Sequence, residues 1–211
     1  NKTINASQLI DNTVTLAKMA TGTDGNIISY DASGNPVAIA TGTDGQVLTS
    51  TGAGSPPAFE NVGGGITLAT TVAATSGTEI IFTGIPSTAN RIMLLFRGVT
   101  MSADQNIRIT LGTSSGLVTS GYLGTSGYGA AADDRSDSWV WYPANGTLSG
   151  VMTICHMGGN IYVQGHSSKY NVNNTSFGGG DVAVGGVVDR LGIDPAGDAT
   201  FSAGAINIMY D

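Results

Sequence analysis

The chain has 211 residues and a formal net charge of −7, and only 11% of its residues are charged, against roughly a quarter in a typical soluble domain. Hydrophobic residues make up 41% of the sequence, which is enough for a folded core and excludes a wholly disordered chain. The acidic charge comes mostly from scattered Asp residues and excludes a wide basic surface for phosphate backbones, so no nucleic-acid partner is expected.

Small and polar residues dominate the sequence. It contains 32 glycines but only three lysines and two glutamates, the residues that solvated helices favour, so the composition is typical of strands and turns.

The single cysteine, Cys155, has no partner for an intrachain disulfide and is interpreted as a small core residue. No apolar run reaches the roughly 18 residues that span a bilayer, so membrane insertion is not expected. No cofactor is expected either. Because the sequence starts at Asn1, without an initiating Met or a secretion signal, we expect a fragment of a longer protein.

The first segment, residues 5–19, combines apolar residues with residue types that cap helices, but its helical periodicity is only partial. We expect either a short helix or a turn-rich segment in which Ile10 and Val14 contact other copies of the chain.

An internal repeat follows. Residues 20–25 and 40–45 both read Ala-Thr-Gly-Thr-Asp-Gly, an offset of 20 positions, and at the same offset Pro36 matches Pro56. Each unit is predicted to be an Asp-Gly turn, a short β-strand, a Gly turn and an extended stretch that contains the proline.

Each repeat has too few apolar side chains to bury a core by itself, since the first offers only Ile27, Ile28, Val37 and Ile39. Two tandem copies fall short of the three or more that a self-supporting solenoid requires, whereas three chains side by side would supply the missing apolar surface. We therefore predict that residues 1–65 form a homotrimeric, repetitive fibre stalk. A flexible Gly/Ser linker is the alternative, and the regular β-branched pairs between the turns count against it.

The three consecutive glycines at residues 63–65 predict a domain boundary, with a globular head over residues 66–211. Residues 92–96 are apolar on both faces, as in a central strand, and alternation places Trp139 and Trp141 on one face, packed in the core or against another subunit. The predicted strands are residues 66–73, 79–83, 91–99, 106–111, 138–142, 147–156, 160–164, 181–189 and 205–210. Roughly nine short strands without a convincing helix predict an all-β head, an antiparallel β-sandwich of jelly-roll type.

Two long segments rich in glycine and polar residues, 112–137 and 166–180, are predicted to be loops, which at this length are usually functional or disordered. Aromatic rings stack on the apolar faces of sugars, and Asp, Asn and Arg can bind sugar hydroxyls, so these segments suit a carbohydrate; they also suit a protein epitope. The receptor-binding candidates are Tyr122, Tyr128, Asp133, Asp134, Arg135, Lys169, Tyr170 and Asn173.

No catalytic or metal site is predicted, and the chain is not expected to be an enzyme. Neither of the two histidines lies in a catalytic motif: His156 is interpreted as a core or interface residue, with a metal site on a trimer axis as the alternative, and His166 as exposed. Asp133, Asp134 and Asp137 form a dense acidic cluster, interpreted as solvated loop acids, with a calcium or ligand contact and a glycosidase site as alternatives.

Several phrases of the sequence resemble a known family, the tail fibres of tailed bacteriophages and prophages. In the stalk they are residues 6–19, 24–36 and 45–50. In the head they are Phe-Thr-Gly-Ile-Pro at 82–86, residues 91–99 and 107–112, Gly-Tyr-Leu-Gly at 121–124 and the final stretch 201–210. The resemblance covers nearly the whole chain. It implies a homotrimer at the distal, extracellular end of the virion tail fibre, which binds a bacterial surface glycan or outer-membrane protein during host adsorption.

The family supplies no binding motif that could be transferred residue by residue, because its receptor-binding surfaces vary. Two other functions stay open at this point. One is a depolymerase head of the tailspike type, which cuts surface polysaccharide, and the other is a purely structural fibre or a bacterial adhesin.

Overall fold

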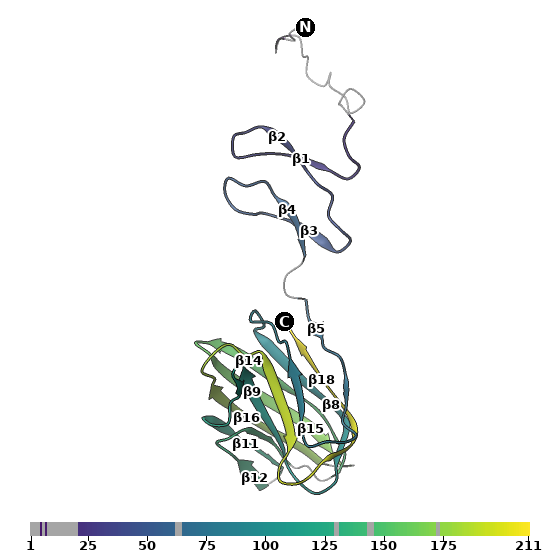
Figure 1. The fold of residues 1–211 in the computed structure, drawn as a ribbon, viewed down its shortest axis with the longest axis vertical. Helices are drawn as coiled ribbons and strands as arrows, with labels where there is room; N and C mark the ends of the chain where they lie inside the picture. Colours follow the sequence, from purple (N-terminus) through teal and green to yellow (C-terminus); the bar gives the residue numbers. More distant parts are fainter. Residues whose placement is uncertain are drawn as a thin grey trace. The chain divides into compact units, whose positions relative to one another are not determined.

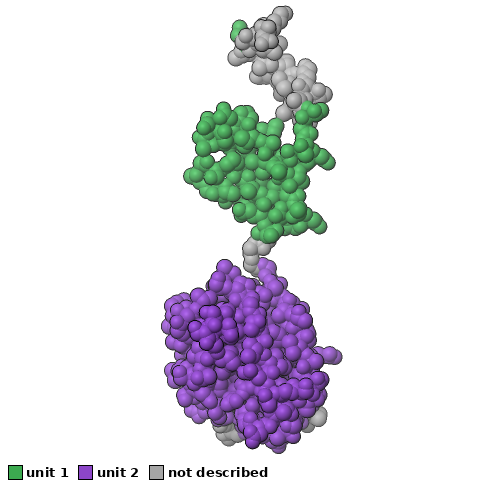
Figure 2. Space-filling view, viewed as in Figure 1, with its two compact units in different colours: residues 1–64 green, residues 65–211 purple. Residues whose placement is uncertain are grey.

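The computed structural model describes residues 5, 7, 21–61, 65–128, 131–142, 146–171 and 174–211. It divides the chain into two compact units, residues 1–64 (unit 1) and 65–211 (unit 2), one residue before the boundary expected from the sequence (Figure 2). Both units are all-β, their strands pair antiparallel, and no α-helix occurs among the described residues. The described residues accordingly include no helix long and apolar enough to cross a membrane. The helix or turn expected over residues 5–19 falls almost wholly outside the described residues.

Unit 1 contains two β-hairpins (Figure 1). They are β1 (Ile27–Tyr30) with β2 (Pro36–Ile39), and β3 (Gln46–Thr49) with β4 (Ala58–Asn61). An Asp31 turn closes the first hairpin, because the Asp31 carboxylate accepts hydrogen bonds from the backbone N–H groups of Ser33 and Asn35, both at 2.8 Å.

The sequence repeat is also a structural repeat. The backbone N–H groups of Asn26 and Gln46 each donate to the carbonyl three residues earlier, at 3.2 Å and 3.1 Å. The glycines of these two turns, Gly25 and Gly45, have φ angles of 76° and 86°, a region that a residue with a Cβ atom rarely adopts. The Asp-Gly pairs therefore form turns because of this backbone requirement.

None of the side chains of residues 21–61 is buried. Ile28 and Tyr30 of the first hairpin are 61% and 65% exposed, and Val47 and Leu48 of the second are each 44% exposed. A two-stranded hairpin without a covered hydrophobic face is at best marginally stable in water. Taken as a single chain, this part of unit 1 thus lacks the burial that normally stabilises a fold.

Unit 2 is built from two antiparallel sheets. The large sheet has the order β12 (Ala131–Asp134), β11 (Tyr122–Tyr128), β16 (Asn174–Ala183), β15 (Ile161–Tyr170), β14 (Leu148–Gly158), β8 (Arg91–Met101), β18 (Phe201–Tyr210) and β5 (Thr67–Leu68), and β6 (Val72–Ala73) also pairs with β18. The small sheet has the order β10 (Gly116–Leu117), β9 (Ile107–Thr113), β17 (Arg190–Pro195) and β7 (Ile80–Thr83), and β13 (Trp139–Trp141) also pairs with β9.

One hydrophobic core draws side chains from both sheets. Trp139 and Trp141 are 2% and 0% exposed, which confirms that both are packed in the core, and Val140 between them is also buried at 4% exposure. Trp141 meets Phe96 of the large sheet edge to face, with ring centroids 4.7 Å apart, and Trp139 meets Tyr122 in the same way at 5.3 Å. The two tryptophans therefore join the small sheet to the large one.

The prediction that residues 112–137 and 166–180 are loops is wrong. The first segment contains β10, β11 and β12, and the second belongs to the β15–β16 hairpin. These strands are rich in glycine and serine and lack the apolar alternation by which a strand is recognised. At Gly178 an added Cβ would lie 2.3 Å from the backbone oxygen of Thr125 and 2.6 Å from Cε1 of His166, so close packing of the strands requires glycine there.

Two predicted strands are divided in the structure. Residues 181–189 do not form one strand, because β16 ends at Ala183 and β17 begins at Arg190 in the other sheet. Residues 66–73 contribute two short strands, β5 and β6, which both pair with β18. Between β16 and β17 the chain passes from the large sheet to the small one, and the two glycines at 185–186 lie in this connection. Hydrophobic periodicity does not predict such a crossing.

Candidate functional site

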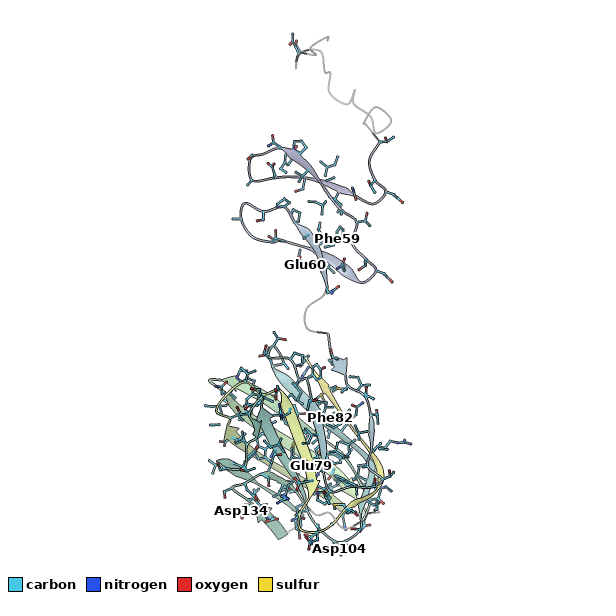
Figure 3. The ribbon with its side chains drawn as sticks, viewed as in Figure 1. Phe59, Glu60, Glu79, Phe82, Asp104 and Asp134 are labelled. Atoms are coloured by element: carbon cyan, nitrogen blue, oxygen red, sulfur yellow. The ribbon has the colours of Figure 1, made fainter. Side chains whose placement is uncertain are left out.

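The predicted candidates at residues 133–135 lie where the chain leaves β12 of the large sheet toward β13 of the small sheet (Figure 3 labels Asp134). Two contacts fix this segment. The Asp133 carboxylate accepts a hydrogen bond from the side-chain amide of Asn106 at 2.6 Å, and the backbone N–H of Tyr122 donates to the carbonyl of Ser136 at 3.2 Å. The segment is therefore held against both neighbouring strands, β11 and the start of β9.

Arg135 and Asp137 form a bidentate ion pair in this segment. Nε and Nη2 of Arg135 donate to the two carboxylate oxygens of Asp137 at 2.8 Å and 2.9 Å. The hydrogen bond from Arg135 lowers the pKa of Asp137 to about 2, against the opposing effect of burial. Their side chains are 37% and 39% exposed, so the pair contributes little stability but presents charges of fixed geometry to a partner.

A surface hollow of about 570 Å³ lies beside this ion pair, within the size range of ligand sites, about 300–1,000 Å³. We call it the β11 hollow. It is lined by Tyr122, Leu123, Gly124, Asp134, Arg135, Ser136 and Asp137. Leu123 is 65% exposed and supplies an apolar contact, while the guanidinium keeps N–H groups that the Asp137 pair does not use.

Tyr122 is not an exposed aromatic platform, contrary to its place among the receptor-binding candidates. It is 1% exposed, and its hydroxyl accepts a hydrogen bond from the backbone N–H of Leu111 at 2.8 Å. Burial raises the pKa of this phenol to about 12. Tyr122 begins β11 with its side chain on the core face, so its ring supports the small sheet and only part of the residue borders the β11 hollow.

The structure does not bring all the remaining candidates to this hollow. Lys169 is exposed on β15 and is not among the lining residues. Tyr128 and Tyr170 end β11 and β15, but their side chains fall outside the described part of the structure, as does the whole of Asn173. Asp134 and Arg135 are thus the two exposed candidates that the hollow unites.

His166, predicted to be exposed, is 6% exposed on the core face of β15. The amide oxygen of Gln164 can only accept, so Nδ1–H of His166 donates to it at 2.9 Å. Nε2 of the neutral ring therefore accepts from the Ser126 hydroxyl at 2.8 Å, and this hydroxyl in turn accepts the backbone N–H of Tyr142 at 2.9 Å. Burial lowers the pKa of His166 to about 4, which keeps the ring neutral at pH 7.

The Ser126–His166 contact has the geometry of a nucleophile and its base, but its setting is different. Ser126 is 0% exposed, and Gln164 offers the histidine a neutral acceptor where hydrolases have a carboxylate. Next to it, Ser168 accepts the indole N–H of Trp141 at 2.8 Å. In the described structure these groups satisfy one another and anchor Trp141 between the sheets.

His156 is partly buried on β14, and its ring stacks on that of Tyr162 with centroids 4.8 Å apart. Among the described residues its Nε2 has no hydrogen-bond partner. Within the same part of the chain, no group of three or more His, Cys, Asp or Glu side chains lies close enough together to hold a metal ion.

The arrangement can therefore bind a ligand through hydrogen bonds from Arg135, hydrogen bonds to Asp134 and an apolar contact with Leu123. Sequence reasoning missed Leu123, because its segment was interpreted as a loop in which an apolar residue carries no positional meaning. The alternation of β11, with Tyr122 inward and Leu123 outward, becomes visible only once its pairing with β16 is known.

We found no match to the chain among protein-family models, curated proteins or solved structures.

Proposed function

We propose that the protein is the distal part of a bacteriophage tail fibre, in which unit 1 is a homotrimeric stalk and unit 2 a jelly-roll-like β-sandwich head that binds a receptor on the bacterial surface. In this proposal the protein belongs to the virion and acts outside the host cell. Its receptor is a glycan or an outer-membrane protein, and host adsorption is its function.

The observation that carries the proposal is the absence of any buried side chain in residues 21–61, although these residues form a regular repeat of hairpins. The exposed apolar side chains repeat along hairpins that are separated by glycine turns. This pattern favours a fold in which identical chains pack against one another and bury these side chains. Three copies would place Ile28 and Leu48, which occupy equivalent positions in the two repeats, in contact with their counterparts.

Attachment by the head is supported by the β11 hollow, which combines exposed charges in a fixed pair with an exposed leucine. A trimer would carry three such hollows, and several fibres on one virion would multiply them further. Weak binding at each hollow then suffices for firm attachment, because linked sites raise the avidity by about 10²–10⁴.

Light scattering coupled to size-exclusion chromatography tests the stalk. We expect a mass of three chains per particle, and a stable monomer would overturn the trimeric stalk and with it the fibre.

Fluorescently labelled protein applied to a panel of bacterial strains tests attachment. We expect saturable binding to a subset of strains. Periodate treatment of the cells, which cleaves sugar diols, should abolish binding if the receptor is a glycan, and protease treatment should abolish it if the receptor is an outer-membrane protein. Absence of binding to every strain, including the strains that the parent phage infects, would contradict the adhesive function.

A further inference from the structure

A second hollow lies on the face of the small sheet that points away from the core. Its volume is about 410 Å³, and it shares Asp137 with the β11 hollow. We call it the small-sheet groove. Besides Asp137, its lining includes Glu79, Arg108, Thr110, Leu117, Thr119 and Asp194. Most of these side chains are polar, and none is aromatic (Figure 3 labels Glu79).

An ion pair between neighbouring strands forms part of the wall. Arg108 of β9 lies opposite Asp194 of β17, and both Nε and Nη2 of Arg108 donate to the same carboxylate oxygen, Oδ2, the first at 2.8 Å. The Asp194 side chain is 17% exposed, and burial raises its pKa although Arg108 opposes the shift. The arginine thus fixes the orientation of the carboxylate while engaging only one of its two oxygens.

Thr110 lies beside this pair and has an unsatisfied hydroxyl. The residue is 6% exposed, and its Oγ1 has no hydrogen-bond partner among the described residues. Buried hydroxyl groups are nearly always paired, and an unpaired one calls for a partner such as an ordered water or an ion. A polar lining with an incomplete hydrogen-bond set therefore distinguishes this groove from an ordinary surface depression.

The charges of the lining select the ligand. The groove has three carboxylates, from Glu79, Asp137 and Asp194. Arg108 pairs with Asp194 and Arg135 with Asp137, so of these carboxylates only that of Glu79 has no salt bridge among the described residues. An anionic ligand would be repelled by these carboxylates and would find no unpaired cation among the groove's lining residues. A ligand with many hydroxyl groups would instead donate hydrogen bonds to the oriented carboxylates at no cost in charge.

We propose that the small-sheet groove binds an uncharged, polyhydroxylated ligand, a neutral saccharide, and that it discriminates against acidic sugars. This inference rests on the proposed adhesive function, because it names the class of ligand that the head would recognise. Through the shared Asp137 a longer saccharide can continue from the groove into the β11 hollow.

Ligand-observed NMR with the intact protein tests the selectivity. The probes are methyl glycosides of glucose, galactose and mannose, and the hexose that binds best is then compared with its own uronic acid, which has the same ring and one added carboxylate. We expect at least about tenfold tighter binding of the neutral sugar, because the added carboxylate of the uronic acid would lie close to the carboxylates of the groove. Equal or tighter binding of the uronic acid would overturn the proposal.

Two variants test the location. Thr119→Trp places a large side chain at an exposed lining position and should weaken binding of the neutral hexose about tenfold or more by filling the groove. Glu79→Ala removes one carboxylate acceptor and should weaken it about tenfold, the equivalent of one charge-assisted hydrogen bond. The matched control, Thr175→Trp, changes an exposed threonine on β16 outside both hollows and should leave binding unchanged. Unaltered hexose binding by Thr119→Trp, with unfolding like that of the wild type, would contradict the site.

The outcomes separate this inference from the proposed function. If the protein attaches to bacterial cells but no neutral hexose or hexose oligomer binds, the groove assignment fails and adhesion stands. If hexoses bind and Thr119→Trp abolishes their binding, but wild-type protein attaches to no cells, the groove stands and adhesion fails.

Discussion

At the scale of single residues, His166 derives its properties from its surroundings. Its ring is buried against Trp141, with centroids 5.0 Å apart, and both ring nitrogens are engaged by neutral partners. Protonation would add a charge to this site and would force Ser126 to give up its role as donor. The fold therefore stabilises the neutral form, which is why the pKa falls to about 4.

This burial predicts a pH-dependent stability. The pKa of His166 is about 4 in the folded state and about 6.5 when unfolded, so the unfolded chain binds more protons between these values. The contribution is fully present above pH 6.5 and is lost as the pH falls toward 4, by about 3 kcal/mol. Urea unfolding followed by tryptophan fluorescence between pH 7 and 4 measures the loss.

The matched variant for this prediction is His166→Gln, which keeps a polar side chain without a titrating ring. It should be less stable at pH 7 and should lose much less stability than the wild type on acidification. Equal pH slopes for the two proteins would show that another group is responsible.

At the scale of elements, glycine decides how closely β11, β15 and β16 approach. Gly178 and Gly165 lie in the β15–β16 hairpin, but their surroundings differ. A Cβ on Gly178 would meet the Thr125 backbone at 2.3 Å, whereas a Cβ on Gly165 would meet nothing within 4 Å. Close packing against β11 therefore requires glycine at position 178, whereas position 165 has room for a larger side chain.

We expect Gly178→Ala to destabilise the head by about 1–3 kcal/mol, the usual cost of forcing extra atoms into a packed interior. Gly165→Ala is the matched control and should be neutral or slightly stabilising, because it restricts the unfolded chain and meets no clash. Chemical denaturation of the two variants checks the contrast. Similar stabilities would refute the close approach of β11 and β16 at this point.

At the scale of the whole molecule, the two units are stabilised in different ways. Unit 2 has an extended hydrophobic core, whereas residues 21–61 of unit 1 have no buried side chain. Burial of apolar surface is the main favourable contribution to folding, and residues 21–61 gain little of it from one another. This asymmetry underlies the proposal of a trimeric stalk.

The proposal predicts the effect of charging the exposed apolar positions of the stalk. The double variant Ile28→Asp and Leu48→Asp should shift the protein from trimer to monomer, because three added charges would face one another at each position. Ser55→Asp, at an exposed turn, should leave the trimer intact. Light scattering measures both.

The same double variant should bind a soluble monovalent ligand as tightly as the wild type but should attach to cells about 10²–10⁴-fold more weakly, since only avidity is lost. A monomeric variant that attaches to cells as firmly as the wild type would show that the number of heads does not matter.

The sequence by itself determined the features that depend on neighbouring residues. The all-β class, the repeated Asp-Gly turns of unit 1 and the burial of Trp139 and Trp141 follow from local periodicity and turn chemistry. Such features need no knowledge of which strands meet.

Only the tertiary structure decided what depends on strand register. Arg108 and Asp194 are 86 positions apart, and no local pattern predicts that they pair. The burial of Tyr122 and His166 also depends on tertiary structure, because their glycine-rich segments are strands that place both side chains in the core. Pairing between distant segments is a property of the whole fold, because the surfaces that stabilise it come together only when the chain folds. A local sequence pattern therefore cannot predict which strands pair.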